Sequence, residues 1–479
     1  MTFHGFFLNS FLDIHMSSST PEVTLKDIAS LAKRRGFIFP GSEVYGGFAN
    51  TYSYGPYGAQ LKKTVKDLWW KRFVETSDDV VGLDGPILLH PMTWKASGHV
   101  DGFSDALVDC KACKARHRVD HVLENALGID VEGFSLEKMD ALIAEHHIKC
   151  PRCGKHDFTP SRKFNLMFQT QMSKTESGDY AYLRPETAQA IFLDFKNVCD
   201  SLRVRVPFGI AQIGKAFRNE ITPGNFIFRT IEFEQMEIEY FIKEEEWETR
   251  FDSWINRMLT WCDLIGLSRE NLVLHEHAAE KLSHYSKRTV DIQFRFPFGI
   301  SELYGLAYRT DFDLKQHMQH SGKSLEYTDP ADQKRWVPHV IEPTFGLDRS
   351  LLALLCQAYA VETLEGGDQR TVLRFKPYMA PVHVAVFPLM KKEPLQEKAT
   401  NLYRLLKSAG LRVEYDDSAA IGKRYRRQDE IGTPYCVTVD FDSLENNDVT
   451  LRDRDTMKQE RLSIGTLVER LKSLTSIPM

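Results

Sequence analysis

The 479-residue sequence has few cysteines, no long apolar run and no large excess of charge of either sign. A membrane-spanning helix needs about 18 or more consecutive apolar residues, so no membrane partner is expected. Eight cysteines in a chain of this length exclude a disulfide scaffold. The net charge of −5 excludes a protein that is basic all over, although it allows a local basic surface. The sequence therefore predicts a globular protein of two or three domains.

The first 15 residues are apolar but lack a basic start and a small-residue cleavage site, so they do not read as a signal peptide. Two interpretations stay open: a disordered leader over residues 1–21, or a translation start at Met16. Nothing in the sequence indicates export, and we expect a cytoplasmic protein.

Composition divides the chain into a large domain over 22–376 and a small one over 377–479. Residues 102–160, which are charged and contain four cysteines, interrupt the first as an insertion. The second alternates strand and helix in the manner of an α/β domain. Periodicity predicts helices over 22–36, 58–75, 188–197, 247–267 and 347–359, and strands over 80–90 and 340–345.

The strongest chemical signal lies in residues 218–237. Arg218 and Arg229 border the loop 221–228 of an expected strand–loop–strand hairpin, and the second strand is aromatic yet rich in glutamate. A buried carboxylate is costly unless it is paired, protonated or bound to a cation. Arginines suit phosphates, a flat ring suits a base, and carboxylates suit an ammonium group. The alternative is that the arginines simply pair with Glu220 and Glu232 in a sheet.

A second segment, 341–349, runs through Gly346 into a very apolar helix with Arg349 in its first turn. The helix dipole disfavours a cation at that end, so Arg349 is expected to face a bound anion. Together with the hairpin, this segment predicts a nucleotide site.

Four cysteines form two Cys-x₂-Cys pairs, with residues 114–149 between them. Four thiolates close a tetrahedral site, which predicts structural Zn²⁺ although the gap exceeds that of a compact zinc ribbon. A reduced knuckle without metal is the alternative. The predicted ligands are Cys110, Cys113, Cys150 and Cys153. The nearby His117, His121, His146, His147 and His156 are expected to be solvated, and Cys199, Cys262, Cys356 and Cys436 to be small core residues.

These segments resemble the signature motifs of class II aminoacyl-tRNA synthetases. Phe217-Arg-Asn-Glu220 with Arg229-x₃-Phe233-x₃-Glu237 is similar to the second motif, and Gly346-Leu-Asp-Arg349 with its helix to the third. Gly55–His90 is similar to the first, which forms the dimer interface in that class. Blocks that resemble the homodimeric glycyl-tRNA synthetase family extend over the chain from about residue 22: 36–41, 45–54, 97–99, 184–189, 233–237, 342–344 and 422–434.

The resemblance implies an α+β catalytic domain built on an antiparallel sheet, a zinc-knuckle insertion and a C-terminal α/β anticodon-binding domain, in a homodimer. It also implies a glycine–tRNA ligase, which uses ATP and Mg²⁺ to form glycyl-adenylate and pyrophosphate and transfers glycine to the 3′ end of tRNA(Gly). No covalent enzyme intermediate is implied.

For ATP, the resemblance implies that Arg218 neutralises the α-phosphate and Arg229 the γ-phosphate. Phe233 stacks on adenine with Arg349 on its other face, and Glu302 helps to hold Mg²⁺. Arg218, Arg349 and Glu302 are the implied catalytic residues. The implied ATP-binding set is Arg218, Asn219, Glu220, Phe228, Arg229, Thr230, Ile231, Glu232, Phe233, Glu302, Leu303, Gly346, Leu347, Asp348 and Arg349.

For glycine, the resemblance implies three glutamates around the ammonium group, and Arg118 at the carboxylate. The family more often has serine where this chain has Thr344, so the hydroxyl is kept while the methyl narrows the pocket. A steric wall rejects larger amino acids, so no editing domain is needed. The implied glycine-binding set is Arg118, Glu186, Phe233, Glu234, Gln235, Met236, Glu237, Glu342, Pro343, Thr344, Phe345 and Gly346.

A basic cluster lies in the C-terminal part, where basic residues slightly outnumber acidic ones while the rest of the chain is net acidic. Arginines around Tyr425 suit phosphates and unstacked bases, whereas the alternative is a solvated helix face. The resemblance favours anticodon contacts by Lys423, Arg424, Arg426 and Arg427. The insertion either braces the site through Arg118 or touches the acceptor stem, and both remain open.

Two rival functions are a class II synthetase for serine, threonine or proline, and a non-catalytic nucleic-acid-binding relative. The first requires a pocket built for a side chain, which the glutamates at 186, 237 and 342 argue against. The second is expected to lack the ATP arginines, which are all present here.

Overall fold

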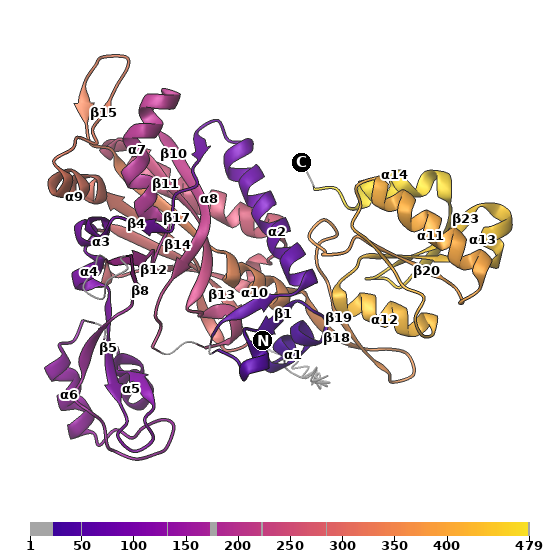
Figure 1. The fold of residues 1–479 in the computed structure, drawn as a ribbon, viewed down its shortest axis with the longest axis horizontal. Helices are drawn as coiled ribbons and strands as arrows, with labels where there is room; N and C mark the ends of the chain where they lie inside the picture. The colour runs from indigo at the N-terminus through magenta and orange to yellow at the C-terminus, as the bar shows by residue number, and fades with distance from the viewer. Residues whose placement is uncertain are drawn as a thin grey trace, which may run out of the picture.

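The computed structural model describes residues 23–477 except 49, 132, 173–179, 222–223 and 284. The leader expected over 1–21 lies outside these residues. Figure 1 shows a large body, a smaller unit with β5, α5 and α6 that extends from it, and a separate C-terminal domain. Within the described ranges, no helix is long and apolar enough to cross a membrane.

A seven-stranded sheet forms the centre of the large body, in the order β12-β13-β14-β17-β11-β10-β3. All neighbours are antiparallel except β3, which runs parallel to β10. The strands are β3 (Val80–Gly82), β10 (Phe208–Phe217), β11 (Glu232–Ile242), β12 (Leu272–Glu276), β13 (Arg288–Phe296), β14 (Gly299–Thr310) and β17 (His339–Gly346).

Helices cover both faces of this sheet, and β11 shows how its side chains divide between them. Met236, Ile238 and Tyr240 point into the main core with α2 (Pro56–Trp70), α8 (Trp247–Ile265) and α10 (Leu347–Ala358). Phe241 points to the other face, into a core with α7 (Ala188–Leu202) and α9 (Phe312–Ser321). Because side chains alternate along a strand, Glu237 and Glu239 share the face that is covered by α7 and α9.

The insertion begins and ends at one place on the large body. Its strand β5 (Ser104–Asp109) pairs with β7 (Arg162–Asn165), and Ser104 lies opposite Asn165. The third strand, β6 (Arg116–Arg118), and helices α5 (Val119–Leu127) and α6 (Leu136–Glu145) enclose a separate apolar core. The charged segment predicted over 102–160 is therefore a small folded unit.

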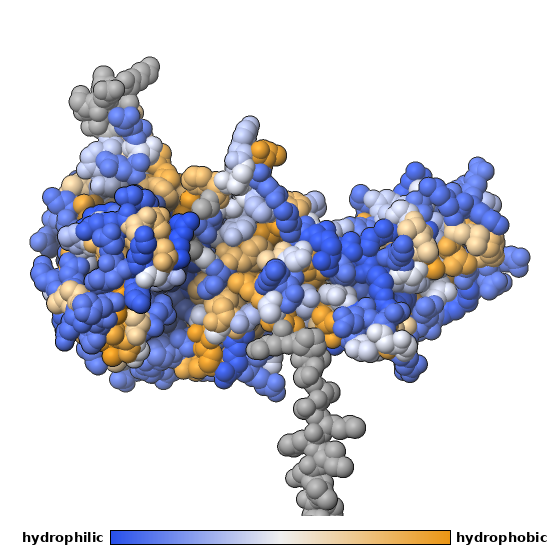
Figure 2. Space-filling view, turned by 90° about the horizontal axis from the view of Figure 1, so that it is seen from below, coloured by the Kyte–Doolittle hydropathy of each residue, from blue (hydrophilic) through white to orange (hydrophobic). Residues whose placement is uncertain are grey.

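The C-terminal domain has its own five-stranded sheet, in the order β21-β20-β22-β23-β24, and its own core. Its elements are β20 (Val384–Pro388), α11 (Glu393–Ser408), β21 (Val413–Tyr415), α12 (Ile421–Ile431), β22 (Tyr435–Val439), α13 (Phe441–Asn446), β23 (Asp448–Asp453), β24 (Gln459–Ser463) and α14 (Ile464–Leu474). Figure 2 shows a mainly hydrophilic surface, with apolar patches on the large body and on this domain.

Short elements complete the fold. Thr24 caps α1 with a reciprocal capping box with Asp27. The remaining elements are α1 (Leu25–Arg34), β1 (Ile38–Pro40), β2 (Tyr52–Tyr54), β4 (Leu88–Leu89), α3 (Pro91–Ala96), α4 (His99–Gly102), β8 (Gln169–Gln171), β9 (Tyr180–Leu183), β15 (Tyr327–Thr328), β16 (Arg335–Trp336), β18 (Tyr359–Thr363) and β19 (Gln369–Leu373).

Two expected strands differ from the structure. The strand predicted over 80–90 is two short strands, β3 and β4, because glycine and proline residues lie between them. The second strand of the hairpin begins only at Glu232, later than the end of the loop predicted over 221–228, and within that loop Phe226–Phe228 form a 3₁₀ turn that packs on aromatic neighbours.

Candidate active site

A cavity of about 280 Å³ lies over the strands of the large sheet and brings together the two segments with the strongest sequence signal. Arg218 and Arg229 come from the ends of the hairpin loop, and Arg349 from the first turn of α10. Glu186, Glu237 and Glu342 line the same cavity. One end of the cavity is thus rich in arginine and the other in carboxylates.

The carboxylate end contains five acids and one central arginine, which we call the acid cluster: Glu186, Glu237, Glu239, Asp313, Glu342 and Arg309. Arg309 is 2% exposed, and its guanidinium donates to both oxygens of Asp313 at 2.8 Å and to Oε1 of Glu342 at 2.8 Å. Buried ion pairs of this kind require hydrogen bonds on every side to offset desolvation. Arg309 supplies them from the centre of the cluster.

Each acid that faces the cavity has its own donors. Glu237 accepts from the hydroxyl of Thr187 and, at 2.9 Å, from that of Thr344. Glu186 accepts from Gln189 at 3.0 Å and lies 3.3 Å from Nε2 of His99. The hydroxyl and amide donors orient the carboxylates without neutralising them, so their negative charge remains available to a cation.

The electrostatics split the acids into two groups. Burial opposes ionisation of Glu186, but His99 and Arg309 hold its pKa well below the usual range. Burial, together with repulsion from Glu237 and Glu186, raises the pKa of Glu342 to about 8 although Arg309 is adjacent. Burial and the charge of Glu186 also raise the pKa of Glu237. A substrate ammonium group would stabilise the ionised form of both.

At the other end, the arginines surround the mouth of the cavity. The Nε of Arg218 donates to the backbone oxygen of Pro185 at 3.0 Å, which fixes the guanidinium 5.4 Å from the ring of Phe233. Arg349 lies 4.4 Å from the ring of Phe228 and pairs with Glu302 at 2.9 Å. Because guanidinium groups grip phosphate oxygens in pairs, this end is suited to a polyphosphate.

Two carboxylates on adjacent strands line the mouth beside these arginines. Arg349 lowers the pKa of Glu302 on β14. Burial and the charge of Glu302 raise the pKa of Asp291 on β13. A hydrogen bond from Nε2 of His277, at 2.8 Å, partly offsets this rise. Paired oxygen ligands of this kind suit a hard divalent cation such as Mg²⁺.

Helix α2 supports the site from behind. Lys62 lies 2.9 Å from Glu234 and 3.2 Å from Asp348, and Lys66 lies 2.8 Å from Glu234. Asp348 also accepts from the backbone N–H of Glu234 at 2.7 Å and from the hydroxyl of Tyr54. These contacts join the segments that resemble the three class II motifs into one network.

Arg184 packs closely against the C-terminal half of β10. Its guanidinium donates to the backbone oxygens of Gly85 at 2.8 Å and Lys215 at 2.6 Å. A Cβ at Gly214 would lie 2.1 Å from the Nη2 of Arg184, so only glycine fits there.

The structure brings most of the expected residues to the cavity. Residues of the two implied substrate sets that line it are Glu186, Arg218, Glu220, Phe228, Arg229, Thr230, Phe233, Glu234, Gln235, Glu237, Glu302, Leu303, Glu342, Thr344, Gly346, Asp348 and Arg349. Of these, Glu234 and Asp348 are already engaged by lysines of α2, which argues for a supporting role.

Several expected residues lie elsewhere, and the alternation of the strands explains part of this. Met236, Phe345 and Leu347 are buried in the main core, so direct contact with a ligand is wrong for their side chains. Pro343 is buried in β17, Asn219 uses its backbone N–H on Leu166, and Ile231 is outside the lining. Glu232 is exposed and pairs with Lys215, whereas the alternative of a structural pair had given it an arginine partner.

Arg118 also does not line the cavity. Its guanidinium pairs with Asp105 at 2.9 Å and with Asp120 at 2.5 Å inside the insertion. Its guanidinium donates hydrogen bonds to Asp120 of α5 and forms an ion pair with Asp105 of β5, and sequence spacing reveals neither contact. Its contact with the carboxylate of glycine stays a prediction, although Arg118 is close enough to act on the charges of Glu220 and Arg229, which line the cavity.

Sequence reasoning missed Arg309 and His99 as members of the site. Arg309 lies near the end of the largely apolar strand β14, just before Asp311-Phe312-Asp313, so a lone arginine in an apolar run was its signal. His99 lies in the block 97–99, and its Nδ1 is 2.8 Å from the hydroxyl of Ser97. The contact of each with a distant acid depends on the fold.

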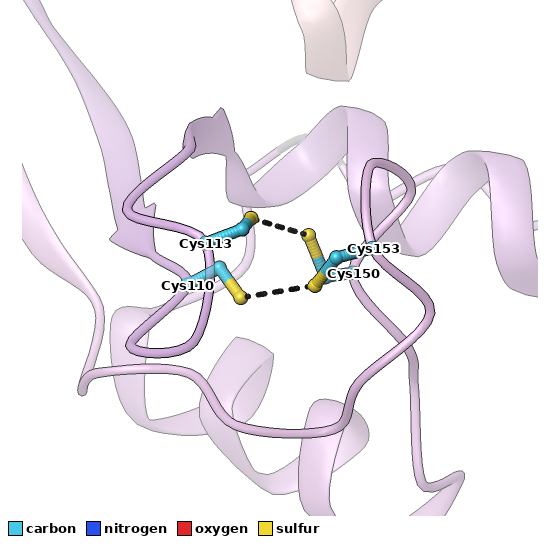
Figure 3. Close-up of side chains that lie close together, drawn as sticks. All are labelled: Cys110, Cys113, Cys150 and Cys153. Atoms are coloured by element: carbon cyan, nitrogen blue, oxygen red, sulfur yellow. Dashed lines mark hydrogen bonds between the residues drawn. The ribbon is translucent and has the colours of Figure 1, made fainter.

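The four predicted cysteine ligands converge in the insertion. The Sγ atoms of Cys110 and Cys153 are 3.6 Å apart, and those of Cys113 and Cys150 are 3.7 Å apart. Figure 3 shows the four sulfurs facing one another from two turns. A tetrahedral ion with Zn–S distances of about 2.3 Å needs sulfurs about 3.8 Å apart, which these residues fit.

The thiols of this cluster differ in their affinity for protons. Hydrogen bonds from backbone N–H groups lower the pKa of Cys110 to about 7, whereas the pKa of Cys153 rises to about 11. His117 lies 3.4 Å from Sγ of Cys150, and His156 contacts the backbone oxygen of Ile148. His117 is half-buried beside the cysteines, so the expectation that it is solvated is wrong, whereas His156 is exposed as expected.

The basic cluster of the C-terminal domain lies on α12 and faces two ways. Arg424 is 2% exposed and donates to the backbone oxygens of Pro388 at 2.5 Å and Ala419 at 2.8 Å. Tyr425 turns inward to Thr438. A direct RNA contact by Arg424 is therefore wrong, because helical periodicity buries its side chain while Lys423 and Arg426 remain accessible.

Comparisons with known proteins agree with this geometry. The family described as "tRNA synthetase class II core domain (G, H, P, S and T)" matches residues 150–358, and "Anticodon binding domain" matches residues 383–474. The fold and the arginine-lined cavity thus define a class II aminoacyl-tRNA synthetase, and the predicted fold class is confirmed.

Relatives narrow the class. A glycine–tRNA ligase of Clostridium acetobutylicum is 55% identical over 461 residues, which cover 94% of this chain and 98% of the relative. Those of Bacillus cereus and Geobacillus kaustophilus are each 54% identical, over 93% of this chain and 97% of the relative. The chain belongs to the glycine–tRNA ligase family, as the resemblance predicted.

Proposed function

We propose that this protein activates glycine with ATP and transfers it to tRNA(Gly). The observation that carries the proposal is one cavity with arginines at one end and Glu186, Glu237 and Glu342 at the other. An amino acid without a side chain offers only its two charged ends for recognition. Three carboxylates serve its ammonium group, and the methyl of Thr344 limits the space beside it.

In the first step, an oxygen of the glycine carboxylate attacks the α-phosphorus of ATP. The bond to the bridging oxygen of pyrophosphate breaks, and glycyl-adenylate forms. Arg218 stabilises the charge that grows on the α-phosphate, and Arg229 binds the γ-phosphate. Alignment of the two substrates supplies much of the acceleration, so no enzyme nucleophile is needed.

We assign Phe233 and Arg349 to the two faces of adenine. Arg349 is held over Phe228 and against Glu302, which sets the plane of its guanidinium. Glu302 would hold Mg²⁺, with Asp291 beside it on the cavity wall. When bound, the ion would neutralise part of the charge on the phosphates.

In the second step, the 3′-hydroxyl of the terminal ribose of tRNA attacks the carbonyl carbon of the adenylate. AMP leaves and an ester forms. The C-terminal domain would bind the anticodon, with Lys423, Arg426 and Arg427 of α12 as the accessible cations. We expect the protein to act in the cytoplasm, where such tRNA is charged.

The cysteine cluster fits structural Zn²⁺, because four sulfurs leave no open coordination position. The ion would hold together two turns that few hydrogen bonds connect, and it would take no part in the chemistry. Residues 22–376, with the insertion, and 377–479 remain the proposed catalytic and anticodon-binding units.

We also propose a homodimer. Val44, Tyr45 and Phe48 are 88%, 89% and 62% exposed on one short segment. Large apolar side chains grouped on a surface mark an interaction site. Sedimentation equilibrium of the wild type and of Tyr45→Glu tests this: a monomeric wild type contradicts it, whereas dissociation of the variant alone supports this segment as the contact.

The decisive test of function is ATP–pyrophosphate exchange that depends on the amino acid. We expect exchange with glycine and none above background with alanine, serine, threonine or proline. No exchange with glycine, or equal exchange with another of these amino acids, contradicts the proposal. Charging of tRNA(Gly) under the same conditions separates an active ligase from a protein that only binds nucleic acid.

A further inference from the structure

Glu239 is a buried carboxyl group for which the site described so far has no use. It is 0% exposed, and neither of its oxygens has a hydrogen-bond partner among the described residues. It lies on β11, two residues beyond Glu237 and on the same face of the sheet. An ionised carboxyl in that position would be among the most costly groups in the molecule.

The register of the sheet places Glu239 against another acid. Antiparallel pairing sets Glu237 opposite Thr344 and Tyr240 opposite Ile341, so Glu239 lies across from Glu342. Oxygens of Glu237, Glu239 and Glu342 all lie within 4.8 Å of one another. Like charges directly opposite each other destabilise a sheet. A proton on either Glu239 or Glu342 therefore removes the repulsion between the two carboxyl groups.

The surrounding groups decide which acid carries this proton. Arg309 of β14 donates to Glu342 at 2.8 Å, and Asp313 of α9 takes the remaining donors of the same guanidinium. Glu237 has its two threonine hydroxyls. On the other neighbouring strand, β10 places the apolar Ile210 opposite Glu239. Glu239 thus lacks the stabilising donor that each of the other acids has.

We propose that Glu239 is a neutral positioning residue, which keeps a proton against Glu342 and so holds the Arg309–Glu342 pair in place for the glycine ammonium. This assignment rests on the proposed glycine site. Three ionised carboxylates at this separation would instead suit a divalent cation, which would occupy the place of the ammonium group. The proton on Glu239 keeps the pocket selective for an organic cation.

Burial, and then the charge of Glu342, raise the pKa of Glu239 well above its ordinary value, in agreement with this assignment. A neutral glutamic acid has a close isostere in glutamine, which also donates a hydrogen bond but does not titrate. Alanine removes the donor and leaves a cavity. The Gln variant therefore keeps a neutral donor that cannot ionise, whereas the Ala variant removes the donor.

The first measurement is infrared spectroscopy of the free enzyme at pH 7. We expect carbonyl absorption from buried protonated carboxylic acids in the wild type and a weaker absorption in Glu239→Gln, in which Glu342 can still contribute. Identical spectra in this region overturn the proposal. This result does not depend on which amino acid is activated, so it stands apart from a failure of glycine-dependent exchange in the wild type.

The second measurement is the pH profile of glycine-dependent exchange between pH 6.5 and 9 at saturating ATP. We expect Glu239→Gln to reduce kcat/KM for glycine by no more than about fivefold at pH 7, and Glu239→Ala by at least about 50-fold, if it folds. We expect the glycine KM of the wild type to rise toward pH 9 as Glu239 loses its proton, and this rise to be smaller in Glu239→Gln. A 50-fold loss in folded Glu239→Gln, or an unchanged alkaline limb, overturns the proposal.

Discussion

Arg309 and Glu342 form a buried ion pair, with Nη1 of the arginine 2.8 Å from Oε1 of the glutamate. The same guanidinium holds Asp313 of α9, so one side chain links β14, β17 and α9. The position of Glu342 in the proposed glycine pocket therefore depends on Arg309, which lines the cavity and is itself buried.

Replacing Arg309 with lysine should damage both stability and activity. Lysine keeps the charge but cannot donate hydrogen bonds to Asp313 and Glu342 at the same time as a guanidinium does. A broken buried ion pair lowers the free energy of unfolding by about 3–5 kcal/mol. Thermal unfolding should show this loss, and glycine-dependent exchange should fall at least about 100-fold. As a control, Arg269→Gln breaks an exposed pair with Asp263, worth about 0–1 kcal/mol. Equal effects of the two variants would contradict the central role of Arg309.

Thr344 allows the hydroxyl and the methyl to be tested separately. Thr344→Val keeps the shape but leaves Glu237 without a donor at 2.9 Å, at a cost of about 1–3 kcal/mol. Steady-state exchange should show a loss of about 10–100-fold in kcat/KM for glycine. Thr344→Ser should keep glycine activity and raise alanine activation by about tenfold, because it frees the space of a methyl. Alanine activation unchanged in Thr344→Ser would argue against a steric wall at this position.

Metal content should follow the cysteine cluster. Freshly purified protein should contain about one zinc per chain, and Cys110→Ser should contain less than half of that by elemental analysis. Cys262→Ala is the matched control, since this thiol is buried in the main core and faces no other cysteine. Loss of zinc should also expose the segment between Ser104 and Asn165 to proteases. A wild type without zinc would refute the site.

The two sides of α12 should respond differently to mutation. Arg426→Glu should raise the KM for tRNA by about tenfold, because one phosphate contact is lost and a repulsive charge gained. Arg424→Lys should instead lower the melting temperature of the C-terminal domain, since Arg424 donates to backbone oxygens inside it. Charging kinetics and differential scanning calorimetry distinguish the two. A purely RNA-binding defect in Arg424→Lys would contradict the buried position.

His383 should make the protein sensitive to acid. Burial, with Arg412 beside it, lowers the pKa of His383 to about 3. The unfolded chain then binds more protons than the folded one between pH 6.5 and 3, so stability falls as the pH drops through that window, by up to about 1.4 kcal/mol per pH unit. Unfolding at pH 7.5 and 5.5 should show a smaller difference for His383→Asn than for the wild type. An equal difference between the two pH values in both proteins would exclude His383 as the cause of the acid sensitivity.

The sequence was sufficient where chemistry lies in local motifs. Arg218, Arg229 and Arg349 were predicted from their places at a loop end and in the first turn of an apolar helix, and the structure brings all three to one cavity. The cysteine pairs were visible from spacing alone. The placement of the arginines and the spacing of the cysteines can both be read without knowledge of the fold. The family resemblance then assigned the arginines to one site.

The sequence was insufficient where a role depends on the partner across the sheet. Met236 and Glu237 are neighbours in sequence, yet one lies in the core and the other in the cavity, and the register decides which. Arg118 seemed free until Asp105 and Asp120 were placed beside it. Glu239 and Glu342 are far apart in sequence, and only the pairing of β11 with β17 sets them face to face.

The pairing of Ser104 with Asn165 has a topological consequence. The chain leaves the large body and returns to it at adjacent points. For the topology of the catalytic sheet, the whole segment between these two residues therefore acts as a turn. Gain, loss or exchange of this segment leaves the threading of the other strands unaltered. The entropy of closing a loop rises only slowly with its length, so a folded unit can replace the turn there at little cost to the sheet.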